Sequence, residues 1–504
     1  MSITKSVEEI ITQHVAFEIE AIDRMYLNLY MNGVQSEQGT AHFFIKHRKK
    51  PCATAQAMSQ MTQAFLKKIE DFVQKHDIDI ITFEKHTRKD DIAKQYLAQF
   101  PDREGVLFIG KAQERCKVFR TYTKTNPNTG KTFASLTKTS AMVNHYYFYC
   151  VDKDFGPFVI KFCSYFPYAG RLCLNGNEYL KRQLENKGIT FESLDNGLKS
   201  CGNSKKAQQI ADEMSAEKID RFIRKWLAFL PDPYSKADHD AGYRYQCSIL
   251  QIEFSLTQVF DRPQHGRLFF EQIISDNLTM GRAERVQLIF GRKIIKTTPS
   301  DFRTRVMMRD VIPSFKVVYK NSSIKQYFKE GRALRTETTI NNTRDFYVGR
   351  LLRNLPKLRE IGFRANRQLL RVERLRYDPM TGQAEFERMM RPMEVNECRV
   401  SGFTFGDPLV LALMMCLLVY RFQMNGLTNQ ELRVMLVELS GIPSSEWSSG
   451  RMTYQLRRLR LRGLIVRLPG SQRYRITDTG LCTAAFYTSC FTQVIHPKAE
   501  CQKS

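Results

Sequence analysis

The chain has 504 residues, of which 42% are hydrophobic, so it has enough apolar material for folded cores and is not a disordered polymer. Its 77 Lys and Arg residues against 52 Asp and Glu give a formal net charge of +25, which favours a polyanionic partner such as nucleic acid. The longest apolar run, Leu409 to Tyr420, is shorter than the about 20 residues of a membrane span, and the first residues lack the apolar core of a signal peptide. We therefore expect a cytoplasmic protein that does not enter a membrane.

Residues 1–104 are predicted to form a helical N-terminal region. The apolar residues that fit a helix there, the first five only roughly, are Ile10, Ile11, Val15, Phe17, Ile19, Met61, Phe65, Ile69 and Phe72.

Residues 105–285 are predicted to form an α+β domain. Strands are expected from Val106 and Val118, with a hairpin turn at Asn126 to Gly130, and again at 145–149 and 158–166. Helices are expected at about 176–187, 204–229 and 234–260.

Residues 286–405 are predicted to form a basic, strand-rich domain with a long helix at about 343–376. Between 286 and 376 there are 22 Lys and Arg against 7 Asp and Glu, which is +15 of the total charge. The period of two puts one set of basic residues on a face away from the apolar positions, and these are Arg303, Arg305, Arg309, Lys316 and Lys320. A short turn or helix is expected at 323–329, and Arg335 and Glu337 share one face of the following strand.

Residues 406–492 are predicted to form a winged helix-turn-helix domain. Asp407-Pro408 is a helix start, Thr428 and Glu431 fit a capping box, and a third helix over about 450–462 precedes two short strands. The whole chain is thus expected to be an α+β multidomain protein, with a helical N-terminal part, a central body of antiparallel strands and helices, and this C-terminal unit.

The third helix is the predicted reader of nucleic acid. Met452, Leu456 and Leu459 should pack inward, and from 451 to 475 there are eight Arg and no acidic residue. The residues predicted to contact nucleic acid are Arg451, Gln455, Arg458 and Arg462 on the helix, with Arg473 and Arg475 on the wing. The alternatives are a solvated basic face and a winged helix used for protein contacts.

A metal-dependent nicking site is the predicted chemistry of the central region. The candidate catalytic residues are Glu337, Tyr327, Tyr319 and Lys161, and the candidate ligands of Mg²⁺ or Mn²⁺ are Glu337, Glu114, Asp152 and Glu253. A carboxylate can hold the ion, a tyrosine can attack phosphorus, and a lysine within an apolar strand requires a partner or a function. The alternative is structural, with Glu337 paired to Arg335 and the tyrosines packed.

The 12 cysteines form no C-x-x-C pair and the 9 histidines show no H-x-x-x-H spacing, so a local zinc or redox motif is not expected. Many of these cysteines lie in apolar runs, and we expect them to be reduced core residues.

Four segments, YYFYCVDKDFGPFVIKFCSYFPY, LNGNEYLKRQL, YKNSSIKQYFKEGRALRTETTIN and MTYQLRRLRLRGLIVRLPGSQRYRIT, resemble an uncharacterised family of bacterial hypothetical proteins. The resemblance implies a prokaryotic source and brings no catalytic residues with it. Tyr319-Lys320 followed by Leu334 to Glu337 is also similar to a pattern of phage and plasmid rolling-circle replication initiators, although the chain lacks their His-hydrophobic-His metal motif.

Together these features predict a nucleic-acid-binding protein of a prokaryotic mobile element that acts in DNA replication or strand processing. DNA is the expected partner and RNA stays open, because surfaces that stack single-stranded bases serve both. The alternative is a non-catalytic DNA-binding regulator or an RNA-binding component of a ribonucleoprotein. The sequence does not indicate an oligomeric state.

Overall fold

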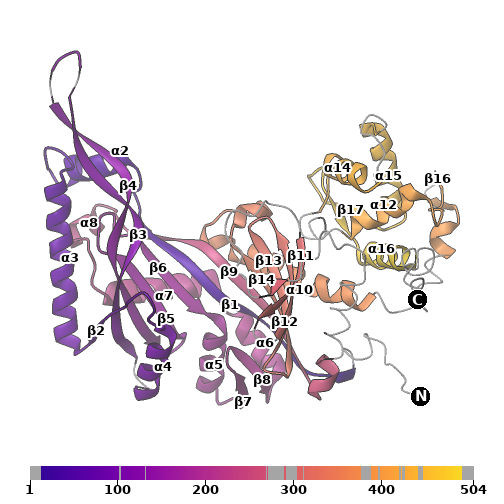
Figure 1. Ribbon diagram of the computed structural model, residues 1–504, viewed down its shortest axis with the longest axis horizontal. Helices are drawn as coiled ribbons and strands as arrows, with labels where there is room; N and C mark the ends of the chain where they lie inside the picture. Colours follow the sequence, from indigo (N-terminus) through magenta and orange to yellow (C-terminus); the bar gives the residue numbers. More distant parts are fainter. Residues whose placement is uncertain are drawn as a thin grey trace, which may run out of the picture. The chain divides into compact units, whose positions relative to one another are not determined.

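The structure is a computed structural model, and it describes residues 13–100, 104–125, 127–130, 132–267, 270, 289–290, 303–309, 312–375, 387–395, 398–418, 422, 426–440 and 447–490. The chain divides into two compact units. Unit 1 comprises Met1–Ile19, Ser255–Ile340 and Glu360–Ser504, and unit 2 comprises Glu20–Phe254 and Asn341–Arg359. Both units contain helices and strands, which confirms the predicted α+β class (Figure 1).

Unit 2 is built around a sheet with the strand order β9-β1-β6-β5-β4-β3-β2. Strands β1 and β9 each run on into unit 1. The elements are β1 (Val15–Met31), α2 (Glu37–His42), η1 (Phe43–His47), α3 (Ala55–His76), β2 (Asp79–Thr82), α4 (Lys89–Gln99), β3 (Gly105–Thr125), β4 (Thr132–Asp152), β5 (Gly156–Cys163), β6 (Gly170–Asn175), α5 (Gly176–Asn186), β7 (Phe191–Leu194), β8 (Gly197–Cys201), α6 (Ser204–Asp212), α7 (Ala216–Phe229), α8 (Lys236–Asp240), β9 (Tyr245–Phe260), η2 (Thr343–Phe346) and η3 (Leu352–Asn354).

The first described strand corrects the prediction of a helical N-terminal region. Val15, Phe17 and Ile19 lie in β1, where buried and more exposed side chains largely alternate from Phe17 to Met31. Their spacing of two is the period of a strand, and β6 supplies hydrogen-bond partners that a local helix reading does not consider. The helix expected around Met61 to Phe72 is confirmed as α3, whereas Ile10 and Ile11 lie outside the described residues.

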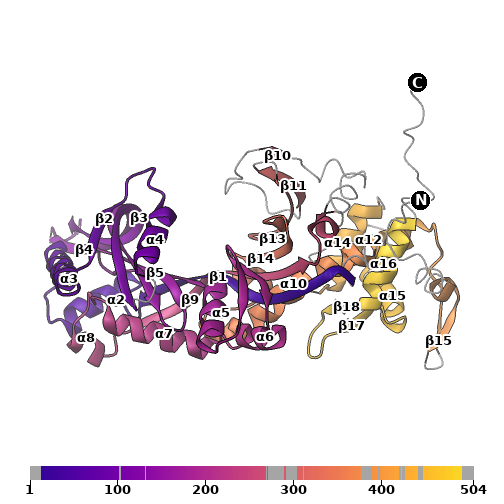
Figure 2. The same ribbon diagram turned by 90° about the horizontal axis from the view of Figure 1, so that it is seen from below.

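Helices cover both faces of the unit 2 sheet (Figure 2), and aromatic side chains attach them to it. On one face, the Phe148 ring lies 6.5 Å from Phe72 of α3, and the Phe158 ring lies 4.7 Å from Trp226 of α7. On the other face, α4 places Tyr96 with its ring 4.6 Å from Phe108 of β3. The hairpin turn predicted between residues 126 and 130 is confirmed, since β3 and β4 pair antiparallel on either side of it.

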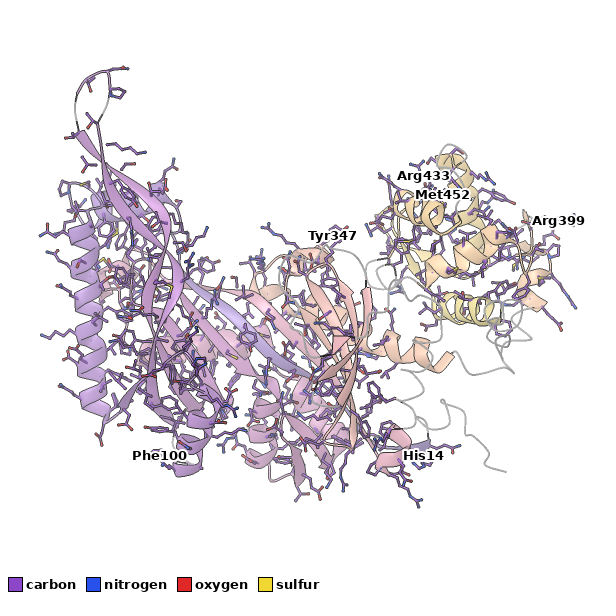
Figure 3. The ribbon with its side chains drawn as sticks, in the orientation of Figure 1. His14, Phe100, Tyr347, Arg399, Arg433 and Met452 are labelled. Atoms are coloured by element: carbon purple, nitrogen blue, oxygen red, sulfur yellow. The ribbon has the colours of Figure 1, made fainter. Side chains whose placement is uncertain are left out.

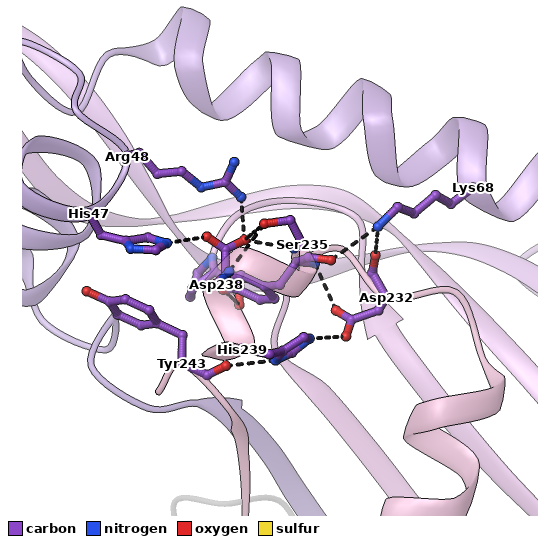
Figure 4. A network of polar contacts seen from close by, with 10 residues as sticks. His47, Arg48, Lys68, Asp232, Ser235, Asp238, His239 and Tyr243 are labelled. Atoms are coloured by element: carbon purple, nitrogen blue, oxygen red, sulfur yellow. Dashed lines mark hydrogen bonds and ion pairs between the residues drawn. The ribbon is translucent and has the colours of Figure 1, made fainter. Parts of the chain in front are cut away.

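A buried polar network holds α8 in unit 2 (Figure 4). Asp238 is 0% exposed and accepts hydrogen bonds from the backbone N–H and hydroxyl of Ser235, from His47 Nε2 at 2.7 Å and from Arg48. The helix expected over 234–260 is wrong beyond Asp240, because Gly242, at a φ of 91°, turns the chain out of α8. The chain leaves α8 and continues as strand β9.

Unit 1 contains a second run of strands in the order β10-β11-β12-β13-β14-β9. The elements of this run and of the helix that follows it are β10 (Ile289–Phe290), β11 (Arg303–Arg309), β12 (Ile312–Tyr319), β13 (Ser322–Lys329), β14 (Ala333–Ile340) and α10 (Leu355–Leu375). The turn or short helix expected at 323–329 is wrong. This segment is β13, because residues 323–329 find partners on β14 and residues 322–327 find partners on β12.

One face of β13 and β14 packs against α10. The Thr338 hydroxyl donates to Oδ1 of Asn366 at 2.7 Å, and both side chains are buried. Ile324 and Gln326 of β13 lie on this same face and are also buried. The opposite face therefore carries the more exposed residues of these two strands.

The C-terminal module comprises the described residues between 387 and 490, and it has its own apolar core. That core extends from Met389 to Tyr487. Met389 and Phe403 precede residue 406, so the module begins earlier than the predicted domain boundary. Its elements are β15 (Met393–Val395), β16 (Cys398–Val400), α12 (Pro408–Leu417), α14 (Asn429–Ser440), α15 (Ser449–Leu461), β17 (Ile465–Arg467), β18 (Tyr474–Ile476) and α16 (Asp478–Cys490). Among the described helices of the whole chain, none combines the length and the apolar composition that a bilayer crossing requires.

Candidate functional site

The helix α15 is the element that the sequence predicts to contact nucleic acid. Ser448 caps it by accepting a hydrogen bond from the Arg451 N–H at 3.1 Å, and Met452, Leu456 and Leu459 are buried as expected. The start of α14 is also confirmed, because the Glu431 carboxylate accepts from the N–H and hydroxyl of Thr428 while the Glu431 N–H donates to that hydroxyl. Figure 3 draws the side chains of these two helices, with Arg433 and Met452 labelled.

Three of the predicted contact residues on α15 are buried instead. Gln455, Arg458 and Arg462 are 5%, 9% and 2% exposed. The Arg458 guanidinium donates to the carbonyl of Gly402 at 2.6 Å and to Oε1 of Gln455 at 2.9 Å. These side chains lie at the edge of the apolar stripe and build the module, so they are not in position to read a groove.

Arg462 joins α15 to the segment before α12. It donates to the carbonyls of Arg388, Arg391 and Ser401 at 3.1, 2.7 and 3.0 Å. Burial lowers the pKa of both Arg458 and Arg462, and the Arg458 charge lowers the pKa of Arg462 further. Both guanidinium groups also lie over the ring of Phe403, at 4.3 and 5.5 Å from its centroid.

The exposed arginines of the module fall on another face of α15 and on the β17–β18 hairpin. They are Arg451, Arg457, Arg460, Arg467 and Arg475. Arg473, which the sequence predicts as a wing contact, is half-buried and forms an ion pair with Glu431 at 3.0 Å. Of the six predicted contacts in the module, Arg451 and Arg475 are therefore exposed. Arg457, Arg460 and Arg467 are exposed arginines that the sequence prediction did not select.

In the central strands, the register aligns basic residues across the sheet. Arg305 pairs with Lys316, Lys316 with Lys325, and Lys325 with Glu337, so the four residues form one row on the face opposite α10. The predicted alternation of Arg303, Arg305 and Arg309 against Val306 and Met308 agrees with this register, although the side chains of β11 lie outside the described part. Lys316 is half-buried, and Lys320 is exposed in the turn after β12.

Two of the predicted catalytic residues meet at β13 and β14. The Tyr327 hydroxyl donates to Oε1 of Glu337 at 2.8 Å, and the same oxygen accepts from Nε of Arg335 at 2.6 Å. Arg335 is 0% exposed, so the predicted structural pairing of Glu337 is confirmed. Tyr319 pairs with Ser322, a register position on the opposite face of the sheet from Tyr327 and Glu337. The two tyrosines therefore do not form one site.

The four predicted metal ligands stay apart among the described residues. Glu114 binds Lys161, with Oε2 and Nζ 2.5 Å apart. Burial alone would raise the pKa of Glu114, but the Lys161 contact outweighs it and lowers that pKa. Glu253 accepts from Gln251 at 2.7 Å. The prediction that several of these carboxylates gather around one ion finds no support in the described part of the chain, where neither potential metal-ligand cluster contains any of them.

Asp152, a predicted metal ligand, is a buried carboxylate whose hydrogen-bond donors come from the protein itself. It accepts from Nζ of Lys225 at 2.6 Å, from Nε1 of Trp226 at 2.9 Å and from the N–H groups of Asp154 and Phe155. Burial raises its pKa, and these donors lower it by more, so the net shift is downward. The donors lie on α7 and on the turn after β4, and they account for the carboxylate without an ion.

Two clusters with histidine were not predicted from the sequence. Asp261 binds Nδ1 of His14 at 3.0 Å and Nδ1 of His265 at 2.9 Å, and hydrogen bonds from these two rings lower the pKa of Asp261. The second cluster comprises Cys116, His145 and Cys163 in unit 2. Asp261 and His265 are four residues apart on one helical turn, which is a usable sequence signal, whereas the second cluster depends on the order of three strands.

In comparisons with known proteins, no family model, no curated protein and no solved structure matches the chain. The geometry of its own residues is therefore the basis for a functional proposal.

Proposed function

We propose that the chain binds duplex DNA through the C-terminal module, acting as a winged helix in which α15 enters the major groove. The single observation that carries the proposal is the set of five exposed arginines on α15 and its hairpin, within a segment that has no acidic residue from 451 to 475.

The order of elements supports this assignment. Three helices, α12, α14 and α15, precede the β17–β18 hairpin, and α15 follows α14 as a recognition helix follows the first helix of a helix-turn-helix. The bridge between Leu427 and Tyr474 and the ion pair between Arg473 and Glu431 fasten the hairpin to the start of α14. A hairpin fixed in this way can place Arg467 and Arg475 beside the phosphates while α15 lies in a groove.

The buried arginines change which face of α15 does the binding. With Arg458 and Arg462 committed to main-chain carbonyls, the contact face consists of Arg451, Arg457 and Arg460. The Arg451 guanidinium lies 4.6 Å from the centroid of the Trp447 ring, which limits its freedom and helps to aim it.

The shape of the major groove favours duplex DNA over duplex RNA as the partner. The B-DNA major groove is wide enough to admit a helix, whereas the major groove of A-form RNA is deep and narrow.

Metal-dependent nicking stays a prediction. Among the described residues, Glu337 is the one carboxylate of the predicted set that contacts a predicted tyrosine, and Arg335 already binds that carboxylate.

The test is fluorescence anisotropy of the full chain with labelled duplex DNA, duplex RNA and single strands over a range of salt concentrations. The variant Arg457→Ala/Arg460→Ala/Arg475→Ala should weaken duplex DNA binding by about 100-fold and reduce the salt slope by about 3, one for each phosphate contact.

The matched control is Arg224→Ala in α7, whose side chain is 76% exposed and lies in unit 2. It should change neither the affinity nor the slope. Equal binding by the triple variant and the wild type would overturn the proposed interface, and tighter binding of single-stranded RNA than of duplex DNA would favour the ribonucleoprotein alternative.

A further inference from the structure

Three side chains that commonly bind metal ions meet on one face of the unit 2 sheet. Cys116 comes from β3, His145 from β4 and Cys163 from β5, and their ligand atoms all lie within 4.8 Å of one another. His145 and Cys163 are direct partners in the β4–β5 register. The three ligand atoms are therefore mutual neighbours, and the Cys116 thiol donates a weak hydrogen bond to the Lys117 carbonyl at 3.7 Å.

The hydrogen bonds around the cluster leave its ligand atoms available. Nδ1 of His145 lies 3.2 Å from the carbonyl oxygen of Val143. A carbonyl oxygen can only accept, so this contact puts the imidazole hydrogen on Nδ1 and the lone pair on Nε2. A histidine that binds a metal is held in this way by a hydrogen bond from its other nitrogen. The Tyr165 N–H, at 3.4 Å, donates to Sγ of Cys163 and leaves lone pairs of that sulfur free to bind an ion.

The burial of the cluster differs between its members. His145 is 5% exposed and Cys163 is 1% exposed, whereas Cys116 is half-buried. Two members are thus shielded from water, and the third keeps a route by which an ion could enter from solvent.

We propose that Cys116, His145 and Cys163 bind one Zn²⁺ ion. Zinc bonds of about 2.3 Å to sulfur and 2.0 Å to nitrogen require ligand atoms no more than about 4.6 Å apart, a separation that small side-chain rotations from the observed cluster can reach. Two thiolates and a neutral imidazole also cancel the charge of the ion, so the loaded site would bury no net charge. Soft sulfur and imidazole ligands favour zinc over Mg²⁺ or Mn²⁺.

A disulfide between the two cysteines is the competing explanation, and the sheet argues against it. Strand β4 lies between β3 and β5, and neighbouring strands are about 4.8 Å apart, which separates the two backbones by about 9.6 Å. A disulfide needs Cα atoms within about 7 Å. The two thiols can share an ion without the backbone movement that a disulfide would require.

The cluster supplies three ligands, and water would complete a tetrahedral shell. Glu114, two residues before Cys116 on the same face, is held by Lys161 and is not in position to be the fourth ligand. Val118 and Val143 pack with Cys163 in a small apolar cluster, so the half-buried Cys116 marks the side from which solvent can reach the fourth position. This arrangement is typical of an open zinc site and differs from a closed structural one.

The test uses the full chain and the metal alone, without nucleic acid, so its outcome is independent of the DNA-binding proposal. Protein purified without chelator should contain about one zinc ion per chain by mass spectrometry. The apoprotein titrated with Co²⁺ should develop a thiolate-to-cobalt charge-transfer band. Cys116→Ser and Cys163→Ser should each lose the bound zinc and most of the band.

Two control variants should keep the metal. Cys150→Ala removes a buried cysteine of β4 that lies outside the cluster, and His14→Ala disables the histidine cluster of unit 1. If Cys163→Ser does not fold, by circular dichroism, the half-exposed Cys116 still provides the test.

Zinc retained in Cys116→Ser would overturn the proposal. So would wild-type protein that neither contains zinc nor binds added Co²⁺, or a Cys116–Cys163 disulfide found by mass spectrometry of unreduced protein.

Discussion

Among the residues that the structure describes, Arg335 and Arg462 have fully buried side chains, and the two regions that hold them accommodate a guanidinium in different ways. Arg335 of β14 is paired with a carboxylate, since its Nε lies 2.6 Å from Oε1 of Glu337. Arg462, at the end of α15, donates among the described residues to main-chain carbonyls of the 388–401 segment. The first arrangement cancels the charge, and the second keeps the charge and distributes it over peptide dipoles.

The difference shows what each arginine does for the fold. Arg335 and Glu337 are two residues apart on one strand, so their pair fixes side chains on a sheet face and joins no distant segments. Arg462 connects a helix to three points of a chain segment at least 61 residues earlier, so it acts as a cross-link. An arginine that uses its planar set of donors for several carbonyls is poorly replaced by lysine.

The largest effect is expected from Arg462→Ala. The substitution removes a buried guanidinium and leaves several main-chain carbonyls without this donor, so it should lower the free energy of unfolding of the C-terminal module by about 3 kcal/mol. The chain has 2 Trp residues, so the fluorescence of Trp447 in a Trp226→Phe background reports on this module alone during urea unfolding. Arg460→Ala, on the exposed face of the same helix, should change the unfolding free energy by less than about 0.5 kcal/mol. Equal effects of the two variants would contradict the cross-link.

A smaller effect is expected from Glu337→Gln. The amide keeps the shape of the side chain but removes the negative charge that Glu337 places beside the buried guanidinium of Arg335. Because Glu337 is 17% exposed and water can partly replace it, we expect a loss of about 2 kcal/mol. Glu360→Gln, at an ion pair of α10 where the carboxylate is 68% exposed, serves as the control in urea unfolding of unit 1 and should have almost no effect. A loss for Glu337→Gln as small as that of the control would mean that Arg335 does not need a carboxylate.

The smallest effect is expected at low pH, and it concerns Asp152, a buried carboxylate of unit 2. The pKa of Asp152 is raised by burial and lowered by more through Lys225 and Trp226, so it falls below its ordinary value. The stability that this group contributes is therefore complete above about pH 4 and is lost as the pH falls through the lower folded-state pKa. In Asp152→Asn, the unfolding free energy of unit 2 should depend less steeply on pH below about 4 than in the wild type. An unchanged dependence in chemical denaturation at several pH values would contradict the assigned donors.

The sequence predicted the sheet faces better than the helix face. Along β14 a period of two is enough to put Arg335 and Glu337 together, and the structure confirms it. On α15, the positions 455 and 462 lie three residues after the buried Met452 and Leu459, at the margin of the apolar stripe. A long polar side chain at such a margin can turn outward to solvent or inward to carbonyls, and the decision depends on segments far away in the sequence.

The same reason explains why the metal-ligand cluster was not predicted. Cys116, His145 and Cys163 have no short spacing between them, and no local motif links them. They meet only because β3, β4 and β5 are neighbours in that order. Local periodicity identified all three strands but carries no information on which residues stand opposite one another.

The Glu431 carboxylate makes two contacts. It accepts a hydrogen bond at the start of α14, and it forms an ion pair with Arg473, the residue before β18. If the module binds DNA as proposed, this carboxylate fixes the position of the hairpin relative to the start of α14. The length of DNA protected from a nuclease, and the periodicity of that protection, would then depend on Glu431. A shorter side chain at position 431 would weaken nuclease protection at the end of the footprint that the hairpin covers and would leave protection at its centre unchanged.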